Sequence, residues 1–237
     1  MNSVATYFEF CKEIFLEPVK FFREYAPNFS LETALLIGLL SIWIGKIIAF
    51  FWSLLAKVFF NAIFGSFSRN LLIADSIFSW DSQSDIQTII LQSGAVLLQP
   101  FFGILRLALA ALVLWMFAKF FINKSYAEHN NVTYKNSLKI AALAAVSSWL
   151  LVVPFLGGFF AYIAALVFLV IGVRETYMIT SKRALLIVFT PQILFVAFMF
   201  FLFFIIVLLA IAGISSGLLK ADDVSDGFES LMKVFRN

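Results

Sequence analysis

The stretch WLLVVPFLGGFFAYIAALVFLVIGVRETY, residues 149–177, decides the fold of this chain. With the apolar residues before it, it forms a run that holds no charge between Lys139 and Arg174. A single helix over residues 138–173 would be roughly 54 Å long, whereas the hydrocarbon core of a bilayer is about 30 Å thick. Proline and paired glycines break helices, and the run contains Pro154, Gly157 and Gly158 at its centre. We therefore predict two short helices, 138–153 and 159–173, with these three residues as the hinge.

The composition is that of an integral membrane protein. Of the 237 residues, 62% are hydrophobic and 13% are charged, and 31 are Phe. The charged share is about half that of a soluble domain, and a soluble core of this size could not hide so much apolar surface. The net charge of +3 comes from basic residues scattered among the loops, so we expect no nucleic-acid partner.

Five apolar runs predict an all-α membrane domain over residues 31–213. The expected spans are 31–61, 101–121, 138–153, 159–173 and 184–213, since a span needs about 20 residues. Pro100 is expected to end a long loop, 65–99, before the second span, and Pro191 to kink the last span. The third and fourth spans are the two short helices, which form a hairpin.

Both ends of the chain are expected to form amphipathic helices on the membrane surface. In residues 1–30, charges recur at intervals of three or four on one helical face, with apolar residues on the other. Pro18 interrupts this pattern and is expected to open the second of two short helices. In residues 214–237, the apolar residues from Phe228 to Phe235 have helical spacing, which predicts a short C-terminal helix.

The distribution of basic residues predicts the side on which each connector lies. With five spans, the N-terminal segment and the connectors 122–139 and 174–183 share one side, which carries ten lysines and arginines against four on the other. An excess of basic residues marks the cytoplasmic side of a membrane. We therefore expect a cytoplasmic N-terminus, with the C-terminus and the PFLGG turn on the outer side.

Two cations lie where the expected spans would bury them. Lys46 is near the middle of the first span and Arg106 is in the second turn of the second, and the carboxylates lie outside the spans except for Glu32 at the start of the first. A charge at the bilayer centre is costly, so Lys46 either contacts a solute or lipid headgroup or lies shallower than its position indicates. The first span also carries small residues at intervals of three or four from Ala34 to Ser53. We expect this stripe to pack within the chain rather than to form a dimer interface.

The chain lacks the sequence motifs of several common classes of enzyme, metal site and cofactor site. It contains no GxxxxGK[ST], GxGxxG, HExxH or CxxC. His129 and Cys11 are the only residues of their kinds and lie far apart in sequence, so they make a poor catalytic pair. We expect no enzymatic activity, no cofactor and no metal. Cys11 lies among apolar residues and is expected to act as a small packing residue.

Several segments follow one another in a recognisable order. Pro18-Val-Lys20-Phe-Phe-Arg23 precedes the first span, and a turn with Gly157-Gly158 joins two short helices. The segments Ile171-Gly172-Val-Arg174-Glu175-Thr and Ser181-Lys182-Arg183-Ala184 then lead into the last span. This order, over roughly residues 14–212 and most clearly 136–187, resembles the Yip (Ypt-interacting protein) family of five-span membrane proteins, in particular its bacterial branch. The resemblance implies a non-enzymatic protein of the bacterial inner membrane, with a periplasmic C-terminus.

The expected function is that of a scaffold or adaptor that contacts membrane lipids and binds a partner at its cytoplasmic face. The candidate contact residues are Lys46, Arg106, Lys135, Arg174, Lys182 and Arg183. The alternative is a lipid or small-solute translocator, or the membrane subunit of a transport complex. Lys46, the small-residue stripe and the short hairpin, which would thin the bilayer locally, motivate this alternative. The oligomeric state is left open.

Overall fold

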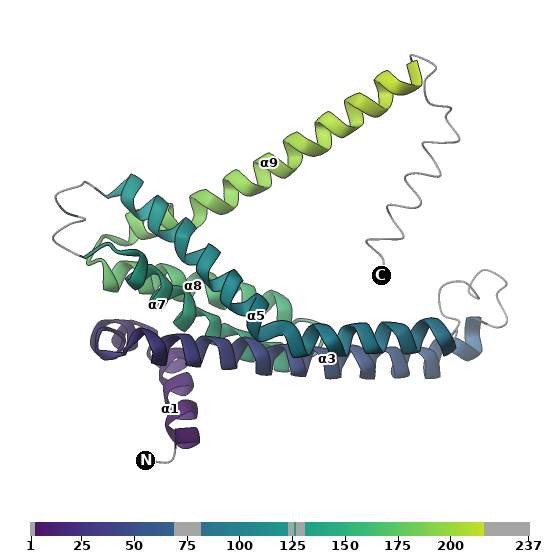
Figure 1. Cartoon of the computed structure of the whole chain (residues 1–237), viewed down its shortest axis with the longest axis horizontal. Coiled ribbons are helices and arrows are strands. Elements are labelled where there is room, and N and C mark those ends of the chain that lie inside the picture. The colour runs from purple at the N-terminus through teal and green to yellow at the C-terminus, as the bar shows by residue number, and fades with distance from the viewer. Residues whose placement is uncertain (1–2, 69–81, 123–125, 127–130, 216–237) are drawn as a thin grey trace. The chain divides into compact units, whose positions relative to one another are not determined.

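The computed structural model describes residues 3–68, 82–122, 126 and 131–215, and within these residues it contains helices and connectors but no strand (Figure 1). The N-terminal segment comprises α1 (Ser3–Leu16), α2 (Pro18–Lys20), the π-helical turn η1 (Phe21–Tyr25) and the 3-10 turn η2 (Ala26–Asn28). The remaining elements are α3 (Leu31–Ser68), α5 (Ser82–Phe121), α7 (Tyr134–Ala144), the 3-10 helix η3 (Ala145–Val152), α8 (Gly157–Thr176) and α9 (Ser181–Ser215). The all-α expectation is therefore confirmed for the described part of the chain.

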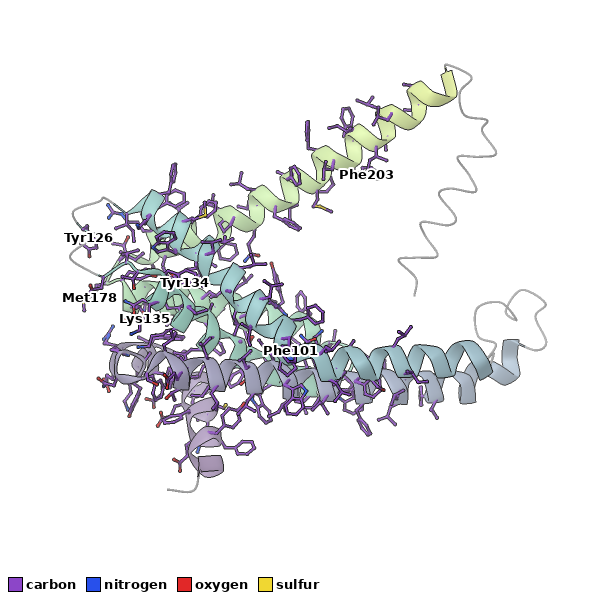
Figure 2. All side chains as sticks on the ribbon, in the orientation of Figure 1. Phe101, Tyr126, Tyr134, Lys135, Met178 and Phe203 are labelled. Carbon is purple, nitrogen blue, oxygen red and sulfur yellow. The ribbon has the colours of Figure 1, made fainter. Side chains whose placement is uncertain are left out.

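Four of the described helices are long and apolar enough to cross a membrane. These segments are Leu31–Ala56, Ser93–Phe121, Gly157–Thr176 and Ser181–Leu209. Large apolar side chains, among them Phe101 on α5 and Phe203 on α9, are exposed on the outside of these helices (Figure 2). Such surfaces are stable against lipid and costly in water, so the protein is embedded in a membrane.

The apolar run over residues 138–173 folds as two helical arms and not as one helix. The chain turns at residues 153–156, where Phe155 has a positive φ of 62°. Ser137 is hydrogen-bonded to Tyr177 near the ends of the arms, and a Cβ on Gly157 would touch the Leu150 carbonyl beside the turn. The arms are therefore antiparallel, as predicted. The first arm is α7 followed by η3, so this predicted span, 138–153, is not one α-helix, and a crossing there stays a prediction.

Small residues on α3 let the first arm of the hairpin approach closely. A Cβ on Gly38 would overlap the Ala142 carbonyl oxygen, and one on Gly45 would lie 2.6 Å from that of Ser148. Ser41 is buried between them and donates a hydrogen bond to the Ile37 carbonyl, as serines in helices often do. The small-residue stripe thus packs within the chain in this part of α3, which confirms the prediction of intramolecular packing there.

The predicted loop over residues 65–99 is wrong. α3 continues to Ser68 and α5 begins at Ser82, so helix occupies most of the expected loop, and residues 69–81 lie outside the described part of the chain. Pro100 does not end a loop but lies inside α5. A proline removes one backbone donor, and the many hydrogen bonds of a long membrane helix tolerate that loss. Pro191 similarly lies inside α9.

The N-terminal segment packs on the hairpin, in the compact unit formed by residues 1–188. Pro18 opens α2, as predicted. Phe22 is fully buried and would meet a Cβ placed on Gly172 of α8, and the ring of Phe15 lies 5.3 Å from that of Phe168. The apolar face of the N-terminal segment, which the sequence predicts to lie on lipid, therefore also packs against the hairpin. Residues 189–215 of α9 belong to a second unit, and the predicted C-terminal helix lies almost wholly outside the described residues.

A candidate anion-binding pocket

A cavity of about 850 Å³ lies where three segments distant in sequence meet. The N-terminal segment contributes Arg23 and its neighbours, the start of the first hairpin arm contributes Lys139, and the end of α8 contributes Arg174 and Glu175. The hairpin brings these segments together, because its antiparallel arms place the end of α8 beside the start of α7. Cavities of this volume accommodate organic ligands. The pocket is therefore the main candidate for a binding site in residues 1–188.

Glu175 connects two of the three cations in this pocket. Its Oε2 accepts a 2.9 Å hydrogen bond from Arg23 Nε, and its Oε1 accepts one of 2.7 Å from Arg174 Nε. The Glu175 side chain is only 9% exposed, whereas that of Arg23 is 64% exposed. Charge-assisted hydrogen bonds of this kind hold both guanidinium groups in fixed places. The described lining residues thus include three cations and one carboxylate, so they carry an excess of positive charge.

Lys139 is the third cation, and a capped helix start positions it. Thr133 caps α7, because its side-chain oxygen accepts a hydrogen bond from the Asn136 backbone N–H at 3.3 Å. Lys139 follows one turn later and donates a long, 3.4 Å hydrogen bond to the Pro27 carbonyl. This contact ties the hairpin to the N-terminal segment and leaves the ammonium group with donors for a ligand.

Apolar side chains form the buried part of the pocket. Phe22, Ile140 and Leu143 line it and are at most 1% exposed. The charged groups lie nearer to the surface, since both arginines are partly exposed. The pocket therefore offers cations at its rim and hydrocarbon at its floor, which is the pattern of an amphiphile's binding site.

The connector between α8 and α9 is held in place by two tyrosines. The Tyr177 hydroxyl is 2.6 Å from the Ser137 hydroxyl, and Tyr126 donates a 2.6 Å hydrogen bond to the Met178 carbonyl. Burial of Tyr177 raises its pKa to about 12, and the hydrogen bond with Ser137 opposes that shift only partly. Tyr126 and Met178 lie at the same end of this unit as Lys135 (Figure 2). These contacts hold one wall of the pocket.

The structure divides the predicted contact residues into three groups. Arg174 lines the pocket, and it also donates a weak 3.5 Å hydrogen bond to Ser181. Lys135, Lys182 and Arg183 are exposed at the start of α7 and α9 and do not line the pocket. Lys46 on α3 and Arg106 on α5 are also exposed, away from the pocket. The described residues include no hydrogen-bonding or ion-pairing partner for either of these two.

The hinge residues line a second, apolar cavity. Pro154, Gly157 and Gly158 border a volume of about 540 Å³ together with Trp52 and other α3 residues. A Cβ on Gly157 would lie 2.6 Å from the Leu150 carbonyl oxygen, so glycine is needed there for the arms to close, while Gly158 has open space around it. Trp52 donates a 2.9 Å hydrogen bond to the Val152 carbonyl, which leaves little unpaired polar surface near this turn.

Sequence reasoning missed Arg23 and Glu175 as site residues, and it included Lys139 only in the cluster of basic residues at the predicted cytoplasmic face. Arg23 and Glu175 are 152 positions apart, and nothing in their spacing indicates an ion pair. The available signal was Glu175 itself, a carboxylate placed directly after the long uncharged run and beside Arg174. A carboxylate at that position needs a basic partner, and the N-terminal segment supplies one.

Comparisons with family models, with curated proteins and with solved structures found no match to this chain.

The spacing GxSxG, which in some hydrolases marks a nucleophilic serine, does occur at residues 213–217. That motif needs a strand before the serine, and the described residues before Ser215 form α9. The pocket therefore remains the best-defined candidate site.

Proposed function

We propose that this protein is a non-enzymatic scaffold or adaptor that binds a protein partner through the exposed basic residues beside the pocket. Three cations carry the proposal: Lys135, Lys182 and Arg183. Each is exposed, and within the described part of the chain no hydrogen bond or ion pair engages its side chain. Unpaired surface cations attract acidic groups and steer acidic partners into contact.

We further propose that this basic surface is cytoplasmic, in a bacterial inner membrane, and that the C-terminus is periplasmic. The excess of ten basic residues over four supports this orientation. The meeting of the N-terminal segment, the start of α7 and the end of α8 around one pocket supports placing these segments on the same side. Five spans and membership of the Yip family stay predictions. The apolar runs and the charge distribution support the five spans, and the order of sequence features supports the family.

A triple variant tests the adaptor function. Lys135→Gln, Lys182→Gln and Arg183→Gln together should abolish the recovery of a stoichiometric protein partner after cross-linking and affinity purification from native membranes. Lys46→Gln with Arg106→Gln is the control, because these cations are also exposed but lie away from this surface. If the triple variant keeps its abundance and every co-purifying protein, the adaptor function is wrong.

The second candidate function is translocation of a lipid or small solute. It is favoured by the exposed Lys46 in a candidate span, for which the described residues provide no counter-charge. The buried stripe around Gly38 and Gly45 no longer supports it, because that surface is closed by the hairpin. Lys46→Met should then lower flux in proteoliposomes, and unchanged flux would count against this function.

A further inference from the structure

We propose that the pocket formed by Arg23, Lys139, Arg174 and Glu175 binds the phosphate-bearing headgroup of an anionic membrane lipid. This inference goes beyond the adaptor function, because it concerns the residues inside the pocket and not Lys135, Lys182 and Arg183 beside it. The two proposals therefore stand or fall on different side chains.

The charges of the pocket fit a phosphate group. Arg23, Lys139 and Arg174 come from three segments and converge on one cavity, where Glu175 is the only acidic residue among the described residues of the lining. A phosphate diester carries one negative charge and oxygen acceptors, which match guanidinium and ammonium donors. Basic pockets at the cytoplasmic ends of membrane helices bind lipid headgroups in this way.

The donors that a phosphate needs are available and oriented. Glu175 engages the Nε atoms of both arginines, together with Nη2 of Arg174. Arg23 uses Nε for its hydrogen bond to Glu175, and a guanidinium group carries further N–H donors on its two Nη atoms. Lys139 makes one long hydrogen bond, to Pro27, and can offer further protons. A single carboxylate thus organises the arginines without using up their donors.

The shape and the floor of the pocket favour a lipid over a soluble anion. The cavity of about 850 Å³ is much larger than a phosphate ion needs, and Phe22, Ile140 and Leu143 give it an apolar floor. One wall is the N-terminal segment, which leads directly into α3, a candidate membrane span. A membrane lipid has its charged phosphate at the bilayer surface and its hydrocarbon chains below it. The pocket likewise has its cations at the rim and its apolar side chains at the floor.

The test measures lipid binding to the purified full chain by native mass spectrometry in detergent. The probes are phosphatidylglycerol and phosphatidylcholine with identical acyl chains. We expect tighter binding of phosphatidylglycerol, and Arg23→Gln with Lys139→Gln should weaken it by about ten- to thirtyfold, because both substitutions remove a direct charged contact to the phosphate. Lys182→Gln with Arg183→Gln is the matched control, since it removes the same charge outside the pocket, and it should change binding less than about twofold.

Other outcomes overturn the proposal. Equal loss of binding in the two double variants would mean that diffuse charge, and not the pocket, retains the lipid. Glycerol 3-phosphate that displaces the lipid at a comparable concentration would assign the pocket to a soluble phosphate ester, and a hexaglutamate peptide that did so would assign it to an acidic protein segment. Lys139→Arg retains the charge and should retain binding, which separates lost contacts from lost folding. Its failure in a folded protein would also contradict the proposal.

Discussion

At the scale of single residues, Tyr177 shows how one polar contact holds the wall of a binding pocket. Its side chain is fully buried where the connector leaves α8, and its hydroxyl is 2.6 Å from that of Ser137 on the other hairpin arm. Both side chains are buried, so neither hydroxyl can form a hydrogen bond with solvent, and each depends on the other as its partner. Tyr177→Phe would leave Ser137 unpaired and should cost about 1–3 kcal/mol of the free energy of unfolding.

The raised pKa of Tyr177 predicts how stability changes at high pH. Burial favours the neutral phenol and raises its pKa from 10.0 to about 12. Below pH 10 both folded and unfolded states keep the proton, so the stabilisation is complete. As the pH rises from 10 to about 12, the unfolded state loses the proton first, and about 2–3 kcal/mol of stability is lost.

Unfolding in detergent at a series of pH values measures this loss. The wild type should lose stability between pH 10 and 12 more steeply than Tyr177→Phe. Lysines titrate in the same range, so the difference between the two proteins is the quantity to follow. Tyr25→Phe, which changes an exposed tyrosine, is the control. Parallel curves for wild type and Tyr177→Phe would show that the buried phenol does not govern this transition.

At the scale of elements, the contact between α3 and the first hairpin arm depends on glycine. Gly38 and Gly45 allow the backbones of α3, α7 and η3 to approach within a distance that no side chain permits. Intrinsic helix propensity would favour alanine at both positions. Close packing of helices inside the membrane outweighs this preference, because dispersion contacts replace the hydrophobic effect there.

Two alanine substitutions test this contact. Gly38→Ala should destabilise the protein by about 1–3 kcal/mol, because the new Cβ would overlap the Ala142 backbone. Gly94→Ala on α5 is the matched control, since a Cβ there has nothing within 4 Å and should be neutral or stabilise the helix by up to about 1 kcal/mol. Thermal unfolding in detergent compares them. Equal effects at the two positions would contradict the close approach.

At the scale of the whole molecule, the proposed topology places the two ends of α8 on opposite sides of the membrane. Phe155 at the turn is 80% exposed and Met178 in the connector is 73% exposed, so both are accessible reporters. Cys11 is the only cysteine of the chain and is buried, so Cys11→Ala provides a cysteine-free background.

Single cysteines in that background test the topology in intact cells. Phe155→Cys should react with a membrane-impermeant maleimide from outside, whereas Met178→Cys should react only after the inner membrane is permeabilised. Both should react equally in detergent, which controls for local accessibility. If Phe155→Cys is also protected in cells, the hairpin does not reach the outer surface, and the first arm does not form a fifth crossing.

Sequence reasoning succeeded where the cause is local or compositional. Apolar composition excludes a soluble fold, because water cannot accommodate so much hydrocarbon surface. Pro154 and the paired glycines predict a turn, because a run of that length exceeds the bilayer and these residues interrupt helices locally. Pro18 opens a helix for the same kind of reason, since its fixed φ suits the first helical position.

Tertiary structure alone decided the features that depend on distant residues. Pro100 remains inside α5, because a long membrane helix outweighs the local cost of one lost hydrogen bond. The 3-10 form of η3 appears where that arm packs against Gly45 and Gly157. The pocket exists because the hairpin returns Arg174 and Glu175 to the side of Lys139 and Arg23. Hydropathy and local propensity predict the helices and the turn of this protein, whereas its candidate site arises from charges brought together across 152 positions of the chain.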